Sequence, residues 1–276
     1  MLSRTVAWVA TALLTCTLSG NAAAASGRVK LLTYNIAGLP DGVMTAQPSA
    51  NMPLIGELLT DYDVVFVQED FAYAAELRQR LKLPYGSAPF VRGGRLDFGD
   101  GLSQFARQPF VDHRRTTWRS CHGIVDSYFD CLTPKGFTFA RQTLAPGVEV
   151  DVYNLHMDAG SSSGDAAARE AQIAQLSEAI AQLSPSAAVI VAGDTNIHAR
   201  QRALLERFQK ETGLSDACDA LNCAEPRRID RVFYRSSRSV RLEARRWSID
   251  HRFVDARKRP LSDHLAVAVE LEWIKP

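Results

Sequence analysis

Short apolar segments with the composition of β-strands alternate along this chain with segments of helical periodicity. Ile173, Leu176, Ile180 and Leu183 form one apolar helical stripe, and Pro185 ends that segment. The alternation predicts an α/β fold. No glycine-rich phosphate loop follows the first strand, which argues against a Rossmann fold. Strands are expected at residues 30–36, 63–68, 136–141, 148–156, 188–192, 229–234 and 265–273, helices at 54–59, 71–81, 161–184 and 200–212, and mostly loop at 84–112.

The first 25 residues have the three-part composition of a secretory signal peptide. Arg4 supplies the positive start, residues 5–18 are mostly apolar, and small residues at 21–26 offer a cleavage site. A membrane anchor is the alternative, but the apolar stretch is shorter than the ~20 residues that span a bilayer. We therefore expect a leader at 1–25, one domain at 26–276, no transmembrane segment in the mature chain, and a secreted or periplasmic location.

Four cysteines remain after the leader: Cys121, Cys131, Cys218 and Cys223. An even number in an oxidising compartment predicts disulfides. Of the three possible connectivities we expect the pairs that are neighbours in sequence, Cys121–Cys131 and Cys218–Cys223. A zinc site is the alternative, but these spacings differ from those of paired C-x-x-C ligands.

Charge is balanced over the mature chain but concentrated in one segment. Removal of Arg4 from the 32 basic residues leaves 31, equal to the 31 acidic residues, which is not a general nucleic-acid-binding composition. Twelve of the basic residues lie between Arg227 and Arg259, against four acidic ones. This segment is either a basic surface beside an anionic substrate or a solvated arginine-rich face, and the sequence leaves both open.

Side chains that bind metals or move protons follow or precede several of the predicted strands. Each alone could cap a helix or form an Asx turn. Together they indicate a site, because the loop ends of a sheet are where rigid elements present chemistry. Carboxylates and amides suit a hard cation such as Mg²⁺, and histidines suit proton transfer near neutral pH. The residues are Asn35, Glu69, His156, Asp158, Asp194, Asn196, Asp230, Asp263 and His264.

Six short motifs in this order make the sequence similar to a known family: TYNI, QED, NLHMD, GDTN, IDRVF and SDH, from Thr33 to His264. The chain resembles the endonuclease/exonuclease/phosphatase superfamily of metal-dependent phosphoesterases, which includes DNase I-like nucleases and neutral sphingomyelinases. The resemblance covers nearly all of the mature chain. It implies a four-layer αββα sandwich of two mixed β-sheets, with the catalytic site at one edge of the sheets.

The resemblance also implies a metal site that uses Mg²⁺ or another divalent cation. Glu69 would be the principal ligand, with Asn35 beside it. Asp263 would support either the metal or His264.

The same resemblance implies catalytic roles for five residues. Asp194 and Asn196 would position the nucleophilic water and the phosphate. His264 would act as a general base or as a charged stabiliser, held in its tautomer by Asp230. His156 would contact the phosphate or assist the leaving group.

Two further segments are similar to the sphingomyelinase branch of the superfamily. Gly101–Arg107 resembles a Gly-Leu-x-x-x-(Ser/Ala)-(Arg/Lys) stretch, and residues 130–137 resemble an Asp-x-x-x-x-Lys-Gly segment. The second resemblance implies that Lys135 lies near the site and contacts a phosphate. The alternative is that Pro134, Lys135 and Gly136 form only a turn before a strand.

These resemblances imply a secreted, Mg²⁺-dependent phosphodiesterase of the sphingomyelinase or phospholipase C type, which acts on a phospholipid headgroup. The alternative is a secreted or periplasmic DNase I-like nuclease, or another phosphoesterase of the superfamily, with nucleic acid as substrate. A non-catalytic binding module is disfavoured because every expected catalytic position carries a competent residue. No long aromatic hairpin for membrane entry is evident, so the candidates for peripheral membrane contact are Phe71, Tyr73, Trp118, Tyr128 and Phe129.

Overall fold

The computed structural model of the chain describes residues 24–43, 47–90, 99–123 and 130–276. Residues 1–23 of the predicted signal peptide lie outside the described residues, as do Tyr128 and Phe129. Among the described residues, no helix is both long and apolar enough to cross a lipid bilayer.

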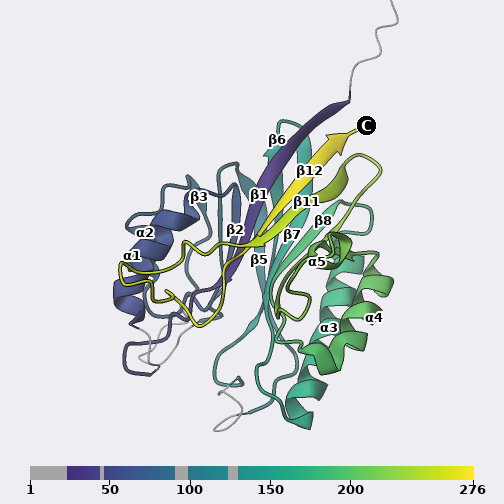
Figure 1. Cartoon of the computed structure of the whole chain (residues 1–276). Coiled ribbons are helices and arrows are strands. Elements are labelled where there is room, and N and C mark those ends of the chain that lie inside the picture. The colour runs from purple at the N-terminus through teal and green to yellow at the C-terminus, as the bar shows by residue number, and fades with distance from the viewer. Residues whose placement is uncertain (1–23, 44–46, 91–98, 124–129) are drawn as a thin grey trace, which may run out of the picture.

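Two six-stranded mixed sheets form the centre of the molecule (Figure 1). The first sheet has the order β11-β12-β1-β2-β4-β3, and the second has the order β5-β6-β7-β8-β10-β9. The strands of the first sheet are β1 (Ala25–Asn35), β2 (Val64–Gln68), β3 (Tyr85–Gly86), β4 (Ser103–Ala106), β11 (Arg241–Ile249) and β12 (Val267–Lys275). Those of the second are β5 (Phe110–Thr117), β6 (Gly136–Ala145), β7 (Val148–His156), β8 (Val189–Asp194), β9 (Ser215–Asp216) and β10 (Asp230–Arg235).

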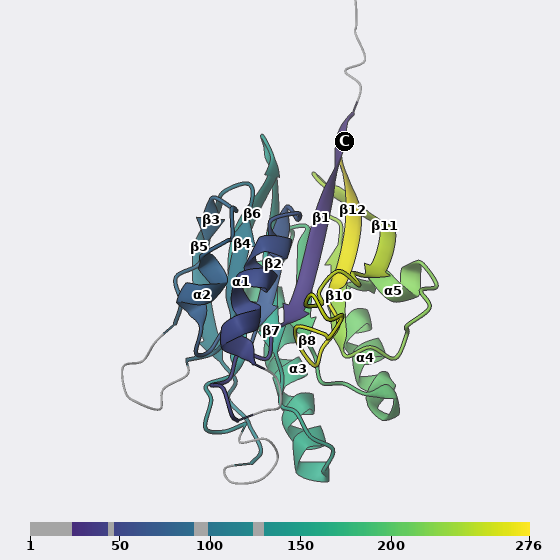
Figure 2. The ribbon, with the colours of Figure 1, turned by 60° about the vertical axis from the view of Figure 1, so that its left-hand side comes forward.

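Helices cover the outer faces of both sheets (Figures 1 and 2). The first sheet carries α1 (Pro48–Leu59) and α2 (Ala74–Arg78), and the second carries α3 (Ser163–Leu183) and α4 (Arg202–Thr212). The short elements η2 (Ala199–Gln201) and α5 (Ala217–Ala220) precede and follow α4 along the chain. The predicted four-layer αββα sandwich is therefore confirmed.

Three apolar clusters fill the spaces between the four layers. In β8, Ile190 and Ala192 face the first sheet, whereas Val189 and Val191 pack against α3 and α4. Alternate residues of a strand point to opposite faces, so a strand buried on both faces must be apolar throughout. This explains why β2 and β8 are almost continuous apolar runs.

The long helix α3 begins with a capping box. The Ser162 hydroxyl accepts a hydrogen bond from the Asp165 amide, and the Asp165 carboxylate accepts one from the Ser162 amide. These bonds satisfy amides that lack partners at a helix start. The predicted start at 161–165 and the stop before Pro185 are both confirmed.

Three predictions of local structure were wrong. The helix expected at 71–81 is reduced to α2, and the expected loop at 84–112 contains β3, β4 and the start of β5. The strand β11 was not predicted, because its arginines hide the alternation of an edge strand that buries one face only. Charged residues on such an edge also discourage pairing with other chains.

The arginine-rich segment is largely engaged in contacts within the chain, which disfavours the first alternative, a free basic surface beside an anionic substrate. Arg231, for example, is buried and pairs with Asp216. Contacts of this kind hold seven of the twelve basic residues: Arg228, Arg231, Arg241, Arg245, Arg252 and Arg259 pair with carboxylates, and Arg235 bonds backbone carbonyls.

Both predicted disulfides are present. Cys121 and Cys131 lie 5.4 Å apart at Cα and ten residues apart in sequence. Cys218 and Cys223 lie 4.9 Å apart at Cα and five residues apart in sequence. The zinc alternative is thereby excluded for these cysteines.

Replacement of Cys121 and Cys131 by Ser is expected to lower the free energy of unfolding by about 3 kcal/mol, because an open loop regains chain entropy when it unfolds. The Cys218 and Cys223 pair closes a shorter loop, and its double variant is expected to lose about 2 kcal/mol. Urea denaturation of both variants measures these losses. A loss below about 1 kcal/mol in the first variant would contradict the prediction.

Candidate active site

Strand register brings the predicted residues to one edge of the two sheets. In the second sheet, His156 of β7 and Asp230 of β10 are both register partners of Asp194 at the end of β8. In the first sheet, Asn35 at the end of β1 pairs with Gln68, which directly precedes Glu69. Five of the predicted residues therefore come from strand ends at this edge.

The site side chains continue the stripe of residues that faces the space between the sheets. On β8 this stripe runs from Ile190 and Ala192 of the inter-sheet core to Asp194. On β7 it runs from Val152 to His156. Residues two apart in a strand point to the same face, so the site is the polar end of the apolar interior.

Two backbone features allow this edge to form. Gly193 has φ +146°, and a Cβ there would lie 2.1 Å from the Leu155 carbonyl oxygen of the neighbouring strand. Only glycine fits this approach, which accounts for Gly193 before Asp194. Glu69 has φ +60°, an uncommon conformation for a residue with a side chain.

Asn35, Glu69 and Asp194 form a cluster that crosses from one sheet to the other. The Asn35 Nδ2 donates to Glu69 Oε1 at 2.9 Å and to Asp194 Oδ2 at 3.1 Å. Asn35 Oδ1 accepts from the Ala37 amide at 3.1 Å, so the amide nitrogen faces the carboxylates.

Burial makes these carboxylates weaker acids. It raises the pKa of Glu69, against the charge of Lys135 and the Asn35 hydrogen bond, which lower it. Burial also raises the pKa of Asp194, against the charge of His264. These two carboxylates are oxygen donors that fit a hard divalent cation, whose charge would offset their burial.

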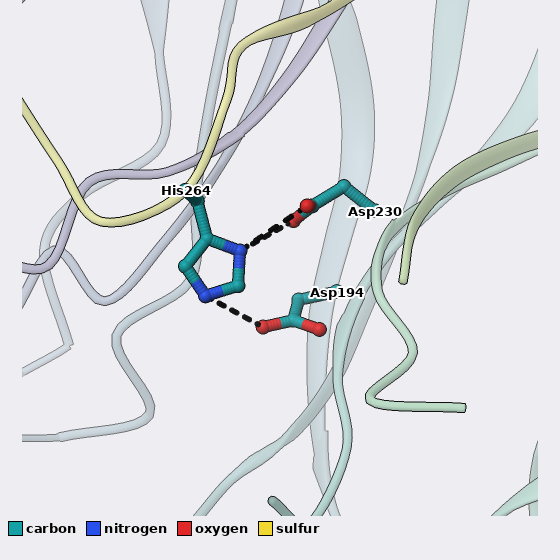
Figure 3. Close-up of side chains that lie close together, drawn as sticks. All are labelled: Asp194, Asp230 and His264. Carbon is teal, nitrogen blue, oxygen red and sulfur yellow. Dashed lines mark hydrogen bonds and ion pairs between the residues drawn. The ribbon is translucent and has the colours of Figure 1, made fainter. Parts of the chain in front are cut away.

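His264 lies between two carboxylates (Figure 3). Its Nδ1 lies 2.9 Å from Asp230 Oδ1, and its Nε2 lies 3.7 Å from Asp194 Oδ2. Burial lowers the pKa of His264, but the Asp230 hydrogen bond and the charges of Asp194, Asp230 and Asp263 outweigh it and raise the pKa to about 10. In this environment His264 is charged at neutral pH.

His156 has the opposite character. Its Nε2 lies 3.6 Å from Asp194 Oδ2 and 3.8 Å from Glu69 Oε1. Burial and the charges of Lys135 and His264 lower the pKa of His156 well below its usual range. At this edge His156 is therefore neutral and His264 is charged.

Lys135 is buried and forms an ion pair with Asp130. Its charge affects the pKa of both Glu69 and His156. Asp130 Oδ2 also accepts a hydrogen bond from the Ala159 amide at 2.6 Å, which ties the lysine segment to the loop after His156. Lys135 thus lies beside the cluster.

Asn196 and Asp263 lie at the border of the cluster. The Asn196 amide donates to Asp194 Oδ1 at 2.9 Å, and its Nδ2 donates to the Met157 carbonyl at 3.0 Å. Asp263 is exposed, and its Oδ1 lies 3.3 Å from the Ser262 hydroxyl. Asp263 therefore reaches the cluster through its charge on His264 rather than by a hydrogen bond to Asn35 or Glu69.

Two residues near the site differ from the sequence analysis. Arg228 was not predicted, and its Nη2 donates to Asp230 Oδ2 at 2.9 Å. Its position two residues before the site aspartate is the only signal that the sequence carries. Trp118, a candidate for membrane contact, is buried instead, and its indole donates to the His156 carbonyl at 2.7 Å.

A sequence model of the Endonuclease/Exonuclease/phosphatase family matches residues 32–264. The chain belongs to this family. A sphingomyelinase of Mycobacterium tuberculosis is 33% identical over 277 residues, which cover 90% of this chain and 54% of that protein. The chain therefore spans about half the length of this curated relative, and together with the motifs the similarity places it on the sphingomyelinase-like branch.

Solved structures share the family fold at lower identity. A variant of Staphylococcus aureus beta toxin with bound magnesium ions has a TM-score of 0.66 and 17% identity, covering 88% of this chain and 99% of that one. D. rerio TDP2 complexed with a single-strand DNA product has a TM-score of 0.67 and 19% identity, covering 88% of this chain and 98% of that one. At these identities the likeness establishes the fold alone.

Proposed function

We propose that this family member is a secreted or periplasmic, Mg²⁺-dependent phosphodiesterase of the sphingomyelinase type. The observation that carries the proposal is the convergence of Glu69, Asp194 and His264 at one sheet edge, with Lys135 beside them. Similarity to a sphingomyelinase supports a phospholipid headgroup as the substrate.

Glu69 and Asn35 would hold the cation, and the exposed Asp263 would contribute charge from the rim. When bound, a divalent cation neutralises the developing charge of a phosphodiester and aligns it. Asn35 is a hydrogen-bond donor to Glu69 in the structure, so it either orients that carboxylate or turns its amide to present oxygen.

Asp194 and Asn196 would position the attacking water and the phosphate. The Asn196 amide fixes Asp194 through Oδ1, which leaves Oδ2 between the two histidines. The buried Asp194 carboxylate can thus accept a proton from a water molecule held at this point.

The two histidines would have different tasks. Asp230 holds His264 through Nδ1, so Nε2 faces the site as a charged donor that stabilises a phosphate anion. His156 is neutral and would contact the phosphate or assist the leaving group through Nε2.

Lys135 would contact the substrate phosphate. Lys135→Met is expected to lower kcat/KM by about 10- to 100-fold, because a buried charge near the phosphate is lost. The variant leaves Asp130 buried without its ion pair, so its free energy of unfolding is expected to fall by about 3–5 kcal/mol.

The double variant Lys135→Met/Asp130→Asn separates these two effects. The asparagine introduced by the second substitution keeps an oxygen for the Ala159 amide and carries no charge, so stability is expected to return while activity stays low. Urea denaturation and initial rates measure both quantities. Recovery of full activity in the double variant would show that Lys135 acts only on stability.

The proposed function is tested by two substrates compared side by side. Purified protein is incubated with sphingomyelin micelles and with supercoiled plasmid, each with Mg²⁺ and with EDTA, and His264→Ala serves as the contamination control. The proposal expects release of phosphocholine that stops in EDTA and in the variant. Plasmid nicking without lipid turnover would overturn it.

A nuclease is the second candidate, since the description of the matched family includes endonucleases and exonucleases. Nucleic-acid binding would weaken steeply with salt, whereas hydrolysis of a zwitterionic headgroup would not. Most basic residues of the segment 227–259 are already paired within the chain, which disfavours a broad nucleic-acid surface there.

A further inference from the structure

Two buried amide side chains join the two sheets directly beneath the active-site cluster. Most of the space between the sheets along the central strands is filled by apolar residues. At the catalytic end of that space lie Gln68 of β2 and Asn154 of β7, and both are fully buried. A buried amide requires hydrogen-bond partners, and here the partners include groups of the opposite sheet.

Asn154 makes its bonds across the gap. Its Oδ1 accepts from Gln68 Nε2 at 2.7 Å, and its Nδ2 donates to the carbonyls of Val67 at 2.9 Å and Ser103 at 3.1 Å. Gln68 is held in turn by the Thr33 hydroxyl, at 3.1 Å from Nε2. One side chain of the second sheet is thus bonded to two strands of the first.

The position of this pair relates it to catalysis. Gln68 directly precedes Glu69, and Asn154 is two residues before His156, on the same inward stripe of β7. The active site is divided between the sheets, because Asn35 and Glu69 belong to the first and His156 and Asp194 to the second.

The contacts that assemble the site therefore depend on the spacing of the sheets. Asn35 Nδ2 to Asp194 Oδ2 is 3.1 Å, and Glu69 Oε1 to His156 Nε2 is 3.8 Å. An apolar contact at this end would be non-directional and would define no particular donor-to-acceptor distance. Directed hydrogen bonds define one distance.

We propose that Asn154 and Gln68 form an inter-sheet amide bridge that sets the distance between the two halves of the active site, with Asn154 as the positioning residue. The catalytic consequence of this bridge rests on the proposed function. Its effect on the cation site does not depend on the identity of the substrate.

The chain offers a matched control at another inter-sheet amide pair. Gln104 of β4 donates to Gln142 of β6 at 3.0 Å, and Gln142 also bonds three backbone carbonyls. Gln142 is fully buried and pairs with Val150, six residues before His156 along β7, or ~20 Å away. It joins the same sheets far from the site.

The test compares Asn154→Leu with Gln142→Leu in the full protein. Three quantities are measured: the melting temperature, the dissociation constant for Mg²⁺ by calorimetry without substrate, and kcat and KM for sphingomyelin and for bis(p-nitrophenyl) phosphate. Both variants are expected to melt at lower temperature. Only Asn154→Leu is expected to weaken Mg²⁺ binding and to lower kcat by about 100-fold with little change in KM.

Equal losses of activity in the two variants, or a wild-type kcat and Mg²⁺ affinity in Asn154→Leu, would overturn the bridge. If Asn154→Leu does not fold, Gln68→Met takes its place, since it removes the bond to Asn154 but leaves the Asn154 contacts to Val67 and Ser103. A wild-type kcat in Gln68→Met would also overturn it. A wild-type protein that binds Mg²⁺ but hydrolyses neither substrate would overturn the proposed function, and the Mg²⁺ affinities would still decide the bridge.

Discussion

Glu69→Gln is expected to lower kcat/KM by about 10³-fold, because the variant removes the charge that would hold the cation. A metal ion contributes several kcal/mol to stabilisation of the transition state, and each 1.36 kcal/mol is tenfold in rate. The glutamine keeps an oxygen to accept the Asn35 hydrogen bond, so the loss should reflect charge rather than a changed geometry. Initial rates at saturating Mg²⁺ measure it.

The same substitution is expected to stabilise the protein in EDTA. Burial raises the pKa of Glu69, so the folded state binds this proton more tightly than the unfolded state does. The ionised carboxyl therefore lowers stability at pH values above the folded pKa, and this loss disappears as the pH falls below the unfolded value near 4.5. Glu69→Gln should melt above wild type at pH 8 in EDTA, and the gap should narrow on acidification.

Glu149→Gln serves as the control, since Glu149 is exposed on β7 near the opposite edge of the second sheet. It is expected to change neither the rate nor the melting temperature. A Glu69→Gln variant with wild-type activity would exclude Glu69 as the cation ligand. A variant that melts below wild type at pH 8 in EDTA would contradict the account of its burial.

Much of the site could be predicted because strand geometry converts sequence position into spatial position. Asp194 ends the apolar run of β8 and His156 ends the valine-rich strand β7, and register makes the two residues neighbours. Two residues at the ends of parallel strands must lie at the same edge of the sheet. Sequence alone therefore indicated an edge lined by acids and histidines, before any distance was known.

Elements whose burial depends on distant partners could not be predicted. Ser103 and Gln104 of β4 are polar but fully buried, because their partners are Asp70 and Gln142 from other strands and loops. Polar residues that closely follow two glycines, here Gly99 and Gly101, favour a loop by composition. Only the assembled sheets provide the hydrogen bonds that make a strand the better choice.

The inter-sheet amide bridge could not be predicted from the sequence for the same reason. Asn154 lies inside the NLHMD motif, but its bonds reach Val67 and Ser103, which are 87 and 51 residues away in sequence. The exposure of Asp263 also could not be predicted from the sequence. The resemblance implies that Asp263 supports either the metal or His264, and in the structure its side chain is exposed at the rim.

His264→Gln is expected to lower kcat by about 10³-fold, within the range for loss of a positioned proton donor or acceptor. Asp230→Asn is expected to lower kcat less at pH 6 than at pH 9. Asp230 provides the hydrogen bond and part of the charge that raise the pKa of His264 to about 10. Without that carboxylate the imidazole loses its proton at lower pH.

The pH profile of Asp230→Asn decides which form of His264 is active. If the charged form stabilises the phosphate, titration of His264 should not change the wild-type kcat from pH 6 to 9, because this range lies below its pKa of about 10. The kcat of the variant should instead fall as the pH rises through the same range. If the neutral form is required as a base, the variant should be faster than wild type near pH 8, because more of its imidazole is free. We expect the first result, since Asp194 lies 3.7 Å from Nε2 and can accept the proton of the water in its place. The control is Asp151→Asn, which changes a buried aspartate five residues before His156 on β7. It should leave the shape of the pH profile unchanged.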